Sequence, residues 1–297
     1  MKIRIGVSGS LSSDLEAFHA LCESTVTLGF DSIWLPEVLT QAALDPYVAL
    51  AWAAAQFPTL KLGGTFMLPG RNPLRMARQI ASLDLLSGGR LLATFVSGIA
   101  TGPERSTLGV EPRDRGGWMD EALPLLRQWF DGAAVHHQGV VGNFEGVSLH
   151  PLPHQQPLEF WLGGALPSAL ERVGRCADGW LPAMISPEEA LAGRKTIEAA
   201  ADRAERVLSD EHYGISIPWS EDELSVSSVT ALAARYPGKE LGDLIPVGMQ
   251  QLQSLLKRFI DVGFSKFVLR PLGSADGQFD RLAHGVLGLQ TGSSPRT

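Results

Sequence analysis

The residue pattern with the clearest capacity for chemistry is the run Gly163-Gly164-Ala165-Leu166-Pro167-Ser168. It follows a predicted strand at residues 158–162 and leads into a predicted helix at residues 167–176. Free backbone N–H groups and the dipole of a helix N-terminus can hold a phosphate there without a cation. An ordinary turn between a strand and a helix, with a serine near the helix cap, explains the same residues. Spacing alone weighs these two interpretations evenly.

Few of the side chains that follow the other predicted strands could take part in binding or catalysis. Glu37 follows the strand Asp31–Leu35 and suits a proton relay or a substrate anchor, although a salt-bridged residue at the rim is the slightly favoured alternative. Trp34 and Trp219 can line the pocket of a planar substrate, but a tryptophan in a buried strand is more often part of the core. Arg270 either binds an anionic group of a substrate or pairs with Glu37.

The usual catalytic constellations are absent from the sequence. The predicted strand ends carry no pair of carboxylates, no cluster of His, Cys and Asp at metal-ligand spacing, and no serine nucleophile turn. We therefore expect no bound metal, and we interpret the 7 histidines as surface residues rather than catalysts. A site with so few acid–base groups suggests that a bound cofactor supplies the chemistry.

Composition limits the partners and the compartment. The 25 basic and 32 acidic residues give a formal net charge of −7, which argues against nucleic acids and anionic membranes as partners. The N-terminal sequence MKIRIGVSGS enters a strand without a signal peptide, and no apolar run is long enough to span a bilayer. Cys22 and Cys176 provide neither a disulfide framework nor a zinc site. We expect a cytoplasmic protein that acts on a small molecule.

The elements that would position these residues alternate between strands and helices. Leu60–Ser97 is the clearest unit, with an apolar strand, a Pro-Gly turn, an amphipathic helix that begins at Pro73, a Gly-Gly break and a second strand. Gly63 and Gly64, inside the first of these strands, indicate a bulge or a close approach of the backbone. A unit of this kind is expected to make a right-handed parallel crossover.

Eight strand–helix units follow one another without a linker. The economical fold is an α/β protein of the (β/α)8 TIM-barrel type, formed by residues 1–290 and followed by a flexible tail at residues 291–297. Two insertions, Pro103–Gly117 and Ser220–Gly242, are expected to cover the barrel mouth, and residues 135–150 are expected to form a hairpin. The alternative is a doubly wound sheet with an appended helical lobe, but VSGSLSS after the first strand lacks the G-x-G-x-x-G turn of that fold.

Five segments together carry a family resemblance: LGFDSIWLPE (28–37), LDPYVALAWAAA (44–55), LPGRNPLRMARQIASLDLLSGGRL (68–91), FWLGGALPSALERVGRCADGWLP (160–182) and GFSKFVLRP (263–271). They resemble the bacterial luciferase-like monooxygenase family, and in particular its probable deazaflavin-dependent oxidoreductase branch, which uses coenzyme F420. The resemblance covers nearly the whole chain. It implies a TIM barrel that binds FMN or the deazaflavin and that forms a homodimer through elements near the second and third strands.

The resemblance also implies roles for particular residues. The cofactor ring would lie over the third strand, where a non-prolyl cis peptide at Thr65–Phe66 would support it. Ser97 and Gly98 would lie near the pyrimidine edge or the ribityl chain. The residues expected to bind the cofactor phosphate, mainly through backbone amides, are Gly163, Gly164, Ala165 and Ser168.

Departures from the family pattern limit which substrates and catalytic residues of the family are expected in this chain. Many relatives carry a histidine after the acidic residue that ends the second strand, where this chain has Val38 as a residue of the substrate pocket. The sugar-phosphate dehydrogenases of the family carry a glutamate pair after the fourth strand, where this chain has Ile99-Ala100. A sugar-phosphate substrate is therefore not expected, and Glu37 is left as the candidate catalytic residue.

Hydride transfer between coenzyme F420 and a small organic substrate is the leading hypothesis for the function. An FMN-dependent monooxygenase is the second, and a non-catalytic flavin-binding protein is the third. Arg71, Arg75 or Arg78 would suit the acidic tail of the deazaflavin, or would instead pair with Asp84. A barrel lyase or isomerase is disfavoured because no lysine follows a strand as a Schiff-base candidate.

Overall fold

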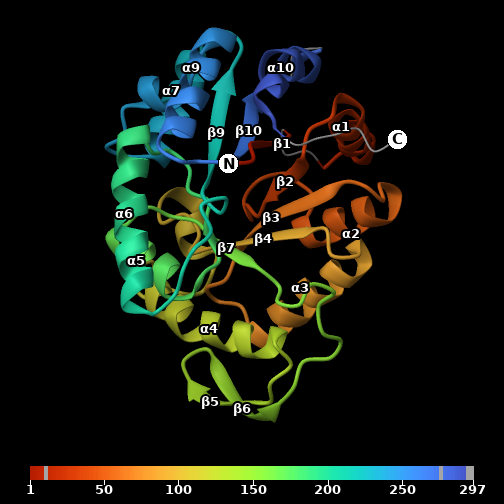
Figure 1. Ribbon diagram of the computed structural model, residues 1–297, viewed down its shortest axis with the longest axis vertical. Helices are drawn as coiled ribbons and strands as arrows, with labels where there is room; N and C mark the ends of the chain where they lie inside the picture. Colours follow the sequence, from red (N-terminus) through yellow and green to blue (C-terminus); the bar gives the residue numbers. More distant parts are fainter. Residues whose placement is uncertain (10–12, 274–276, 292–297) are drawn as a thin grey trace.

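The computed structural model of the protein describes residues 1–9, 13–273 and 277–291, and its centre is a parallel sheet of eight strands (Figure 1). These strands are β1 (Arg4–Val7), β2 (Ser32–Pro36), β3 (Lys61–Met67), β4 (Leu91–Val96), β7 (Phe160–Leu162), β8 (Gly179–Trp180), β9 (Gly214–Ser220) and β10 (Lys266–Leu272). Their order in the sheet is β8-β7-β4-β3-β2-β1-β10-β9. Parallel bridges between Trp180 and Tyr213 and between Ala183 and Ser216 join β8 to β9. The sheet therefore closes, and the predicted (β/α)8 barrel is confirmed.

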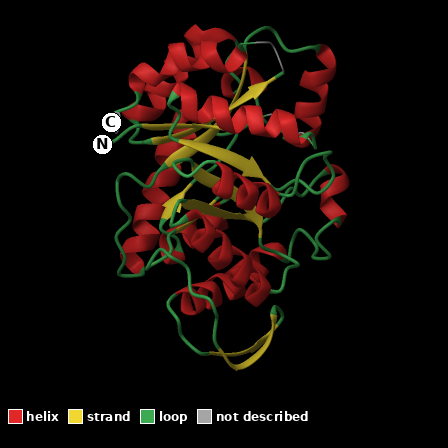
Figure 2. Cartoon of the chain, turned by 90° about the vertical axis from the view of Figure 1, so that its right-hand side faces the viewer, coloured by secondary structure: helices red, strands yellow, loops and turns green. Residues whose placement is uncertain are grey.

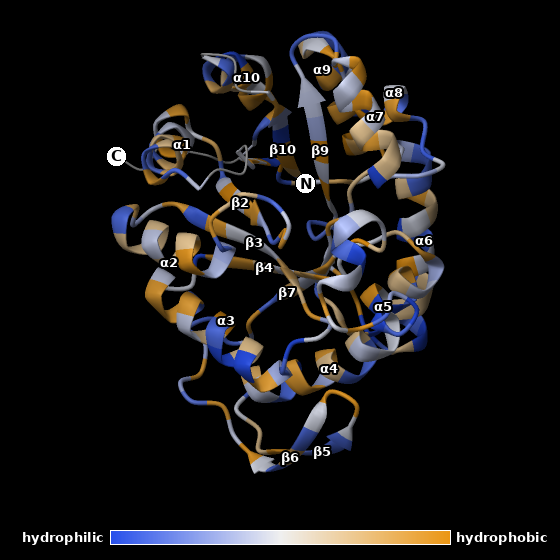
Figure 3. Ribbon diagram, turned by 180° about the vertical axis from the view of Figure 1, so that it is seen from behind, coloured by the Kyte–Doolittle hydropathy of each residue, from blue (hydrophilic) through white to orange (hydrophobic). Residues whose placement is uncertain are grey.

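Helices surround the strands in the predicted alternation (Figures 1 and 2). They are α1 (Leu15–Leu28), α2 (Pro46–Gln56), α3 (Pro73–Ser87), α4 (Arg115–Phe130), α5 (Pro167–Cys176), α6 (Pro187–Arg203), α9 (Gly248–Asp261) and α10 (Gln278–Val286). In Figure 3 the central strand β4 is largely apolar, whereas the outer helices alternate between polar and apolar residues, as amphipathic helices on a barrel do. Among the described helices, none combines the length and the apolar character that a membrane span requires.

Helix caps that the sequence predicts have the expected contacts. The side chain of Asp14 accepts a hydrogen bond from the backbone N–H of Glu16 at the start of α1. Ser186 and Glu189 form a reciprocal capping box at the start of α6. Each contact satisfies an N–H group that has no partner within the first turn of a helix. Local chemistry thus determines where these two helices begin.

A hairpin and two insertions extend the barrel. Strands β5 (Val135–Gly139) and β6 (Gly142–Val147) form the predicted hairpin, which projects beside α4 (Figure 1). The first insertion contains the 3-10 helix η1 (Gly102–Ser106). The second, residues 221–247, contains α7 (Val226–Arg235) and α8 (Leu241–Leu244), and we call it the flap. The hydroxyl of Thr101 donates a hydrogen bond to the backbone carbonyl of Arg235 (3.4 Å), so the two insertions meet at the barrel mouth.

The end of the described chain contacts its beginning. The backbone N–H of Ile3 donates to Thr291 Oγ1 (2.8 Å), and the backbone N–H of Thr291 donates to the carbonyl of Ile3 (3.1 Å). After α10, a second 3-10 helix, η2 (Leu287–Leu289), leads to this contact. Thr291, the first residue of the predicted flexible tail, therefore contacts the first residues of the barrel, and the remaining tail residues, 292–297, lie outside the described residues.

Two indole rings, those of Trp34 and Trp161, fill the middle of the barrel interior. Trp34 packs in one apolar cluster with Leu181, and Trp161 packs against that cluster. Glycines on the neighbouring strands leave the necessary space, because a Cβ atom on Gly63 would stand 2.1 Å from the Trp34 ring and one on Gly179 would stand 2.4 Å from the Trp161 ring. The interior is a packed core rather than a pore.

Strand β3 is regular, which corrects one prediction. It pairs with β2 and β4 in continuous register through Gly64 and Thr65. The cis peptide bonds among the described residues are His150–Pro151 and Gln156–Pro157. The predicted cis peptide at Thr65–Phe66 is therefore wrong. The glycines of β3 reflect close approach instead of a bulge, since their missing side chains leave room for the Trp34 and Phe66 rings.

Lys266 lies inside the barrel at the amino-terminal end of the strands. Its Nζ atom is 5.8 Å from the ring centroid of Trp34 and 5.6 Å from that of Trp161. It is 3.9 Å from Oδ2 of Asp31, whose Oδ1 also binds Lys61 Nζ at 2.7 Å. Burial lowers the pKa of Lys266 from 10.5 to about 8, although the Asp31 carboxylate opposes this effect. The protonated amine is thus less stable in the folded protein than in the unfolded chain.

We expect the substitution Lys266→Met to abolish a pH dependence of stability. In the wild-type protein the free energy of unfolding should rise by roughly 3 kcal/mol between pH 8 and 10.5, because in that window the unfolded chain binds the Lys266 proton and the folded protein does not. At neutral pH the variant should be at least as stable as the wild type, since Asp31 keeps its ion pair with Lys61. Urea unfolding across this pH window measures both effects. The control is Lys195→Met, at an exposed position of α6 away from Asp31, which should keep the wild-type slope; a Lys266→Met protein with that same slope would contradict the prediction.

Candidate functional site

A cavity of about 320 Å³ opens at the carboxyl ends of the barrel strands. Each of the eight strands, or the segment directly after it, contributes to the lining, in chain order through Ser8, Glu37, Thr65, Val96, Gly163, Leu181, Ser216 and Val268. The first insertion adds Glu104, and the flap adds Arg235 with Tyr236 directly after α7. Because barrel enzymes place their active sites at this face, we assign the cavity as the candidate active site.

Most of the residues singled out from the sequence meet in this cavity. They are Trp34, Glu37, Val38, Thr65, Ser97, Gly98, Gly163, Gly164 and Arg270. Strand alternation explains why Phe66 is not among them, since neighbours in a strand point to opposite faces. Phe66 is buried on the other side of β3, where its ring stacks on that of Tyr47 with centroids 4.4 Å apart. Ala165 and Ser168 are exposed near the start of α5, outside the lining of the cavity.

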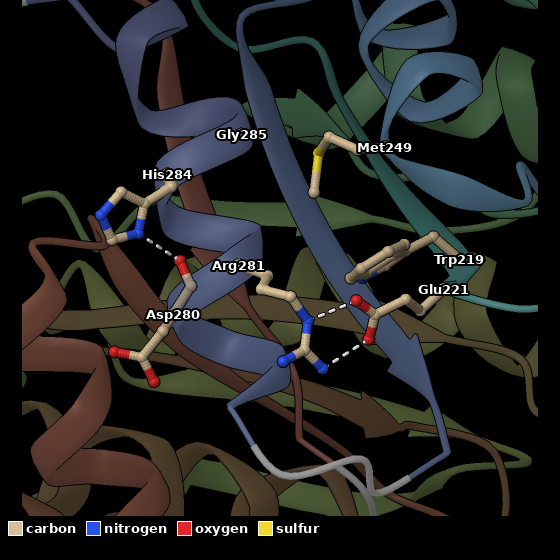
Figure 4. A pocket seen from close by; sticks show the side chains of 7 residues that line it. All are labelled: Trp219, Glu221, Met249, Asp280, Arg281, His284 and Gly285. Atoms are coloured by element: carbon tan, nitrogen blue, oxygen red, sulfur yellow. Dashed lines mark hydrogen bonds and ion pairs between the residues drawn. The ribbon is translucent and has the colours of Figure 1, made fainter.

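Trp219 lines a different cavity, of about 530 Å³, between β9, α9 and α10 (Figure 4). In that cavity it lies beside Met249 and the ion pair of Glu221 with Arg281. The register explains the difference, because Arg270, which lines the mouth cavity, pairs with Pro218, and the next residue of β9 must face outward. Trp219 is therefore not part of the candidate site, contrary to the prediction.

Glu37 lines the cavity, but both of its carboxylate oxygens are engaged. Oε2 accepts a hydrogen bond from the backbone N–H of Met67 (2.7 Å), and Oε1 accepts one from the guanidinium of Arg71. Burial raises the pKa of Glu37, and these two partners oppose the shift. Glu37 thus pairs with Arg71 and not with Arg270. Its contacts suit a residue that holds the end of β3 beside the cavity.

Glu104 is a carboxylate of the cavity that sequence reasoning missed. It is only 6% exposed, and its Oε1 atom accepts hydrogen bonds from the backbone N–H (2.8 Å) and the hydroxyl (2.5 Å) of Thr40. Its Oε2 atom has no partner among the described residues. Thr40 and Glu104 are 64 positions apart, so no local sequence pattern predicts their contact. Glu104 combines a fixed orientation with a free oxygen, as a general acid or base requires.

Arg115 holds the loop that carries Ser97, Gly98 and Glu104. It is 2% exposed, and its guanidinium donates hydrogen bonds to the backbone carbonyls of Arg105 (2.7 Å), Ile99 (2.8 Å) and Val110 (3.2 Å). A longer bond reaches the carbonyl of Ser97 (3.4 Å). A single side chain at the start of α4 therefore fixes the shape of the whole loop.

The turn after β7 has the features of an anion site. Gly164 has a φ of +93°, which favours glycine, and a Cβ atom on Gly163 would stand only 2.7 Å from the Val96 side chain. Within the described part of the chain, the backbone N–H groups of Gly164 and Ala165 have no partner. The buried hydroxyl of Ser8, elsewhere in the cavity wall, also lacks a partner. These donors can hold the phosphate and the polar edge of an extended cofactor.

The cavity has no arrangement of metal ligands. Across residues 1–9, 13–273 and 277–291, no three side chains of His, Cys, Asp or Glu converge as ligands of an ion would. A closed parallel barrel with a cavity at the carboxyl ends of its strands has the architecture of the barrel enzymes. The chain belongs to the family described as luciferase-like monooxygenase, whose sequence model matches residues 1–225. The flap helix α7 begins directly after the matched region.

Two relatives that match the chain carry the names of a dehydrogenase and of a monooxygenase. The chain is 27% identical over 166 residues to an F420-dependent glucose-6-phosphate dehydrogenase of Kineococcus radiotolerans, covering 52% of this chain and 48% of that protein. It is 28% identical over 215 residues to a sulfoquinovose monooxygenase of Agrobacterium fabrum, covering 70% of this chain and 53% of that protein. The matches thus span about half the length of these curated relatives.

A solved structure shares the complete fold. An F420-dependent secondary alcohol dehydrogenase, determined in complex with an F420-acetone adduct, superimposes with a TM-score of 0.82 at 16% identity, covering 98% of this chain and 100% of that chain. At this identity the likeness establishes the shared barrel architecture. The predicted family membership and the predicted class of enzyme are confirmed.

Proposed function

We propose that this protein is an oxidoreductase that moves a hydride between coenzyme F420 and a small organic substrate. The observation that carries the proposal is the mouth cavity, in which the Gly163-Gly164 turn and the free oxygen of Glu104 share one space. The names of a curated relative and of a structural neighbour, both F420-dependent dehydrogenases, support the same choice of cofactor.

The residues of the cavity fit such a cofactor. The unpartnered N–H groups of Gly164 and Ala165 would hold its phosphate, with Ser168 on the first turn of α5 beside them. Ser97, Gly98 and Thr65 would line the ring and the chain that joins it to the phosphate. The buried Ser8 hydroxyl would donate to a polar edge of the ring. When bound, the deazaflavin supplies a carbon centre that accepts or donates a hydride.

Glu104 would handle the proton of the reaction. When an alcohol is oxidised, its carbon loses a hydride and its oxygen loses a proton, and the free Oε2 of Glu104 would accept that proton. In the reverse direction the same oxygen would return it. Thr40 holds the carboxylate through two hydrogen bonds to Oε1, which leaves Oε2 available for the proton. Val38 and Ile99 supply apolar walls beside it.

An FMN-dependent monooxygenase is the second candidate, favoured by the family description and by the relative that is named a monooxygenase. A non-catalytic flavin-binding protein is the third, and the free carboxylate of Glu104 in the cavity argues against it. Titration of the purified protein with F420 and with FMN, followed by fluorescence, tests the proposal. We expect low-micromolar or tighter binding of F420 and negligible binding of FMN. Co-purification of FMN together with oxygen-dependent turnover would overturn the proposal in favour of the monooxygenase.

We further propose that the protein is a homodimer that acts in the cytoplasm. Exposed apolar side chains on the adjacent helices α2 and α3 support a second copy as the partner, with Val48 68% exposed and Leu86 66% exposed. Light scattering on the purified protein should give a mass of twice 31.9 kDa. A monomer mass at assay concentrations would contradict the dimer.

A further inference from the structure

Two arginines stand side by side on the flap side of the mouth cavity without a counter-ion. Arg270 comes from β10 and Arg235 from the end of α7, and Tyr236 lies next to both. The carboxylates that line the cavity are Glu37, which binds Arg71, and Glu104, which binds Thr40. Among the described residues, neither Arg235 nor Arg270 forms an ion pair.

The surroundings of these two arginines do not neutralise their positive charges. The Nε atom of Arg235 is buried and has no hydrogen-bond partner among the described residues, and its guanidinium lies 5.9 Å from the centroid of the Tyr236 ring. Burial lowers the pKa of Arg270, the neighbouring charge of Arg235 lowers it further, and Tyr236 opposes the shift. Two adjacent cations with little solvent repel each other unless an anion lies between them.

The position of the pair separates it from the glycine turn. Along the closed sheet, β8 and β9 lie between β7, which leads to Gly163 and Gly164, and β10, which carries Arg270. An anion bound by the arginines is therefore a second negative group in the cavity, in addition to a phosphate held at the glycine turn. Because the chain as a whole carries a formal charge of −7, this positive patch is a local feature of the site.

We propose that Arg235, Tyr236 and Arg270 form a subsite for an oxyanion group, a carboxylate or a phosphate, of the small molecule that enters the barrel mouth. Guanidinium groups bind such oxyanions with paired, charge-assisted hydrogen bonds, and the tyrosine hydroxyl adds a neutral donor. The assignment of this group to a substrate rests on the proposed function, whereas the binding of the anion itself does not.

The subsite also links ligand binding to the flap. Arg235 and Tyr236 belong to the flap, whereas Arg270 belongs to the barrel, so a bound oxyanion would join the two. The flap also packs on the barrel through a buried apolar cluster of Leu244 and Ile245 with Met184, and through the ion pair of Lys239 with Glu189 (2.7 Å). Anion binding should therefore add a contact between the end of α7 and the barrel at the cavity.

Inorganic phosphate added to the cofactor-free protein, at constant ionic strength maintained with chloride, tests the subsite. Calorimetry should show saturable binding, and Arg270→Gln and Arg235→Gln should each weaken it at least tenfold. Arg113→Gln is the matched control, because Arg113 precedes α4 with its side chain 85% exposed, and it should bind phosphate as the wild type does. Phosphate should also slow tryptic cleavage after Arg235.

Repeating the titration with F420 present identifies the source of the anion. If phosphate binds as before, the subsite belongs to the substrate. If F420 displaces the phosphate, and Arg270→Gln also binds F420 more weakly, the subsite belongs to the acidic tail of the cofactor. Phosphate binding that both arginine variants retain would place the ion at the glycine turn and overturn the proposal, as would the absence of saturable binding. A protein that binds phosphate through the arginines but does not bind F420 would refute the proposed function and leave the subsite intact.

Discussion

Replacing Glu104 by glutamine is expected to lower turnover by about 10²- to 10⁴-fold while leaving the affinity for F420 unchanged. Glutamine keeps an oxygen that can accept the two hydrogen bonds from Thr40, so the loop should keep its shape. It cannot accept the proton that an alcohol releases on oxidation. The measurement is the rate of F420 reduction, with a substrate found by screening small alcohols, compared with the dissociation constant from a fluorescence titration.

Two further variants make this prediction specific. Glu111→Gln changes an acidic residue of the same loop whose side chain is 65% exposed, and it should keep full activity. Glu37→Gln should lower stability and weaken cofactor binding, because it disturbs the contacts with Met67 and Arg71 at the end of β3. If Glu37→Gln instead removed turnover with unchanged affinity while Glu104→Gln stayed active, the proton would have been assigned to the wrong carboxylate.

Replacing Arg115 by methionine is expected to lower the free energy of unfolding by about 2 to 4 kcal/mol. The variant would leave the part-buried backbone carbonyls of Ile99, Arg105 and Val110 without their donor. Because the same loop lines the cavity with Ser97 and Gly98, cofactor affinity should fall together with stability. Urea unfolding gives the first quantity, and a fluorescence titration with F420 gives the second.

Arg113→Met serves as the control for this effect. Its side chain is 85% exposed, so its loss should change the free energy of unfolding by less than about 0.5 kcal/mol. Arg115→Lys should fall between the two, since one ammonium group cannot reach all the carbonyls that the guanidinium binds. Wild-type stability in Arg115→Met would show that the loop holds its shape without this side chain.

The architecture was accessible from the sequence because its signals are local. Proline at the first helical position, as at Pro73 and Pro167, and the capping box of Ser186 determine where helices begin from a few neighbouring residues. Apolar strands between such helices leave few topologies, of which the closed barrel buries both faces of the sheet. The glycine turn at Gly163 was visible for the same reason.

The details of the site depend on contacts between distant residues. The orientation of Glu104 depends on its hydrogen bonds with Thr40. The arginine pair forms because the flap brings Arg235 next to Arg270, which lies 35 residues further along the chain. No spacing rule connects such positions. The placement of Phe66 in the cavity together with Thr65 was an avoidable error, however. Side chains of neighbouring residues in a strand point to opposite faces, so these two residues do not line the same cavity. The cis peptide was transferred from the family, although the close approach of Trp34 accounts for the same glycines.

The fluorescence of Trp34, at the centre of the barrel, should report whether a cofactor occupies the mouth cavity. Trp34 lines the mouth cavity and at the same time fills the interior, where it is 3% exposed and its indole N–H is bound to Ser32 Oγ at 2.9 Å. Its emission should therefore be sharp and shielded from water, and a bound ring that absorbs where indole emits would quench it by energy transfer. Filling and emptying of the site can thus be followed without any added label, as the part of the emission of the 7 tryptophans whose quenching a Trp34→Phe variant loses.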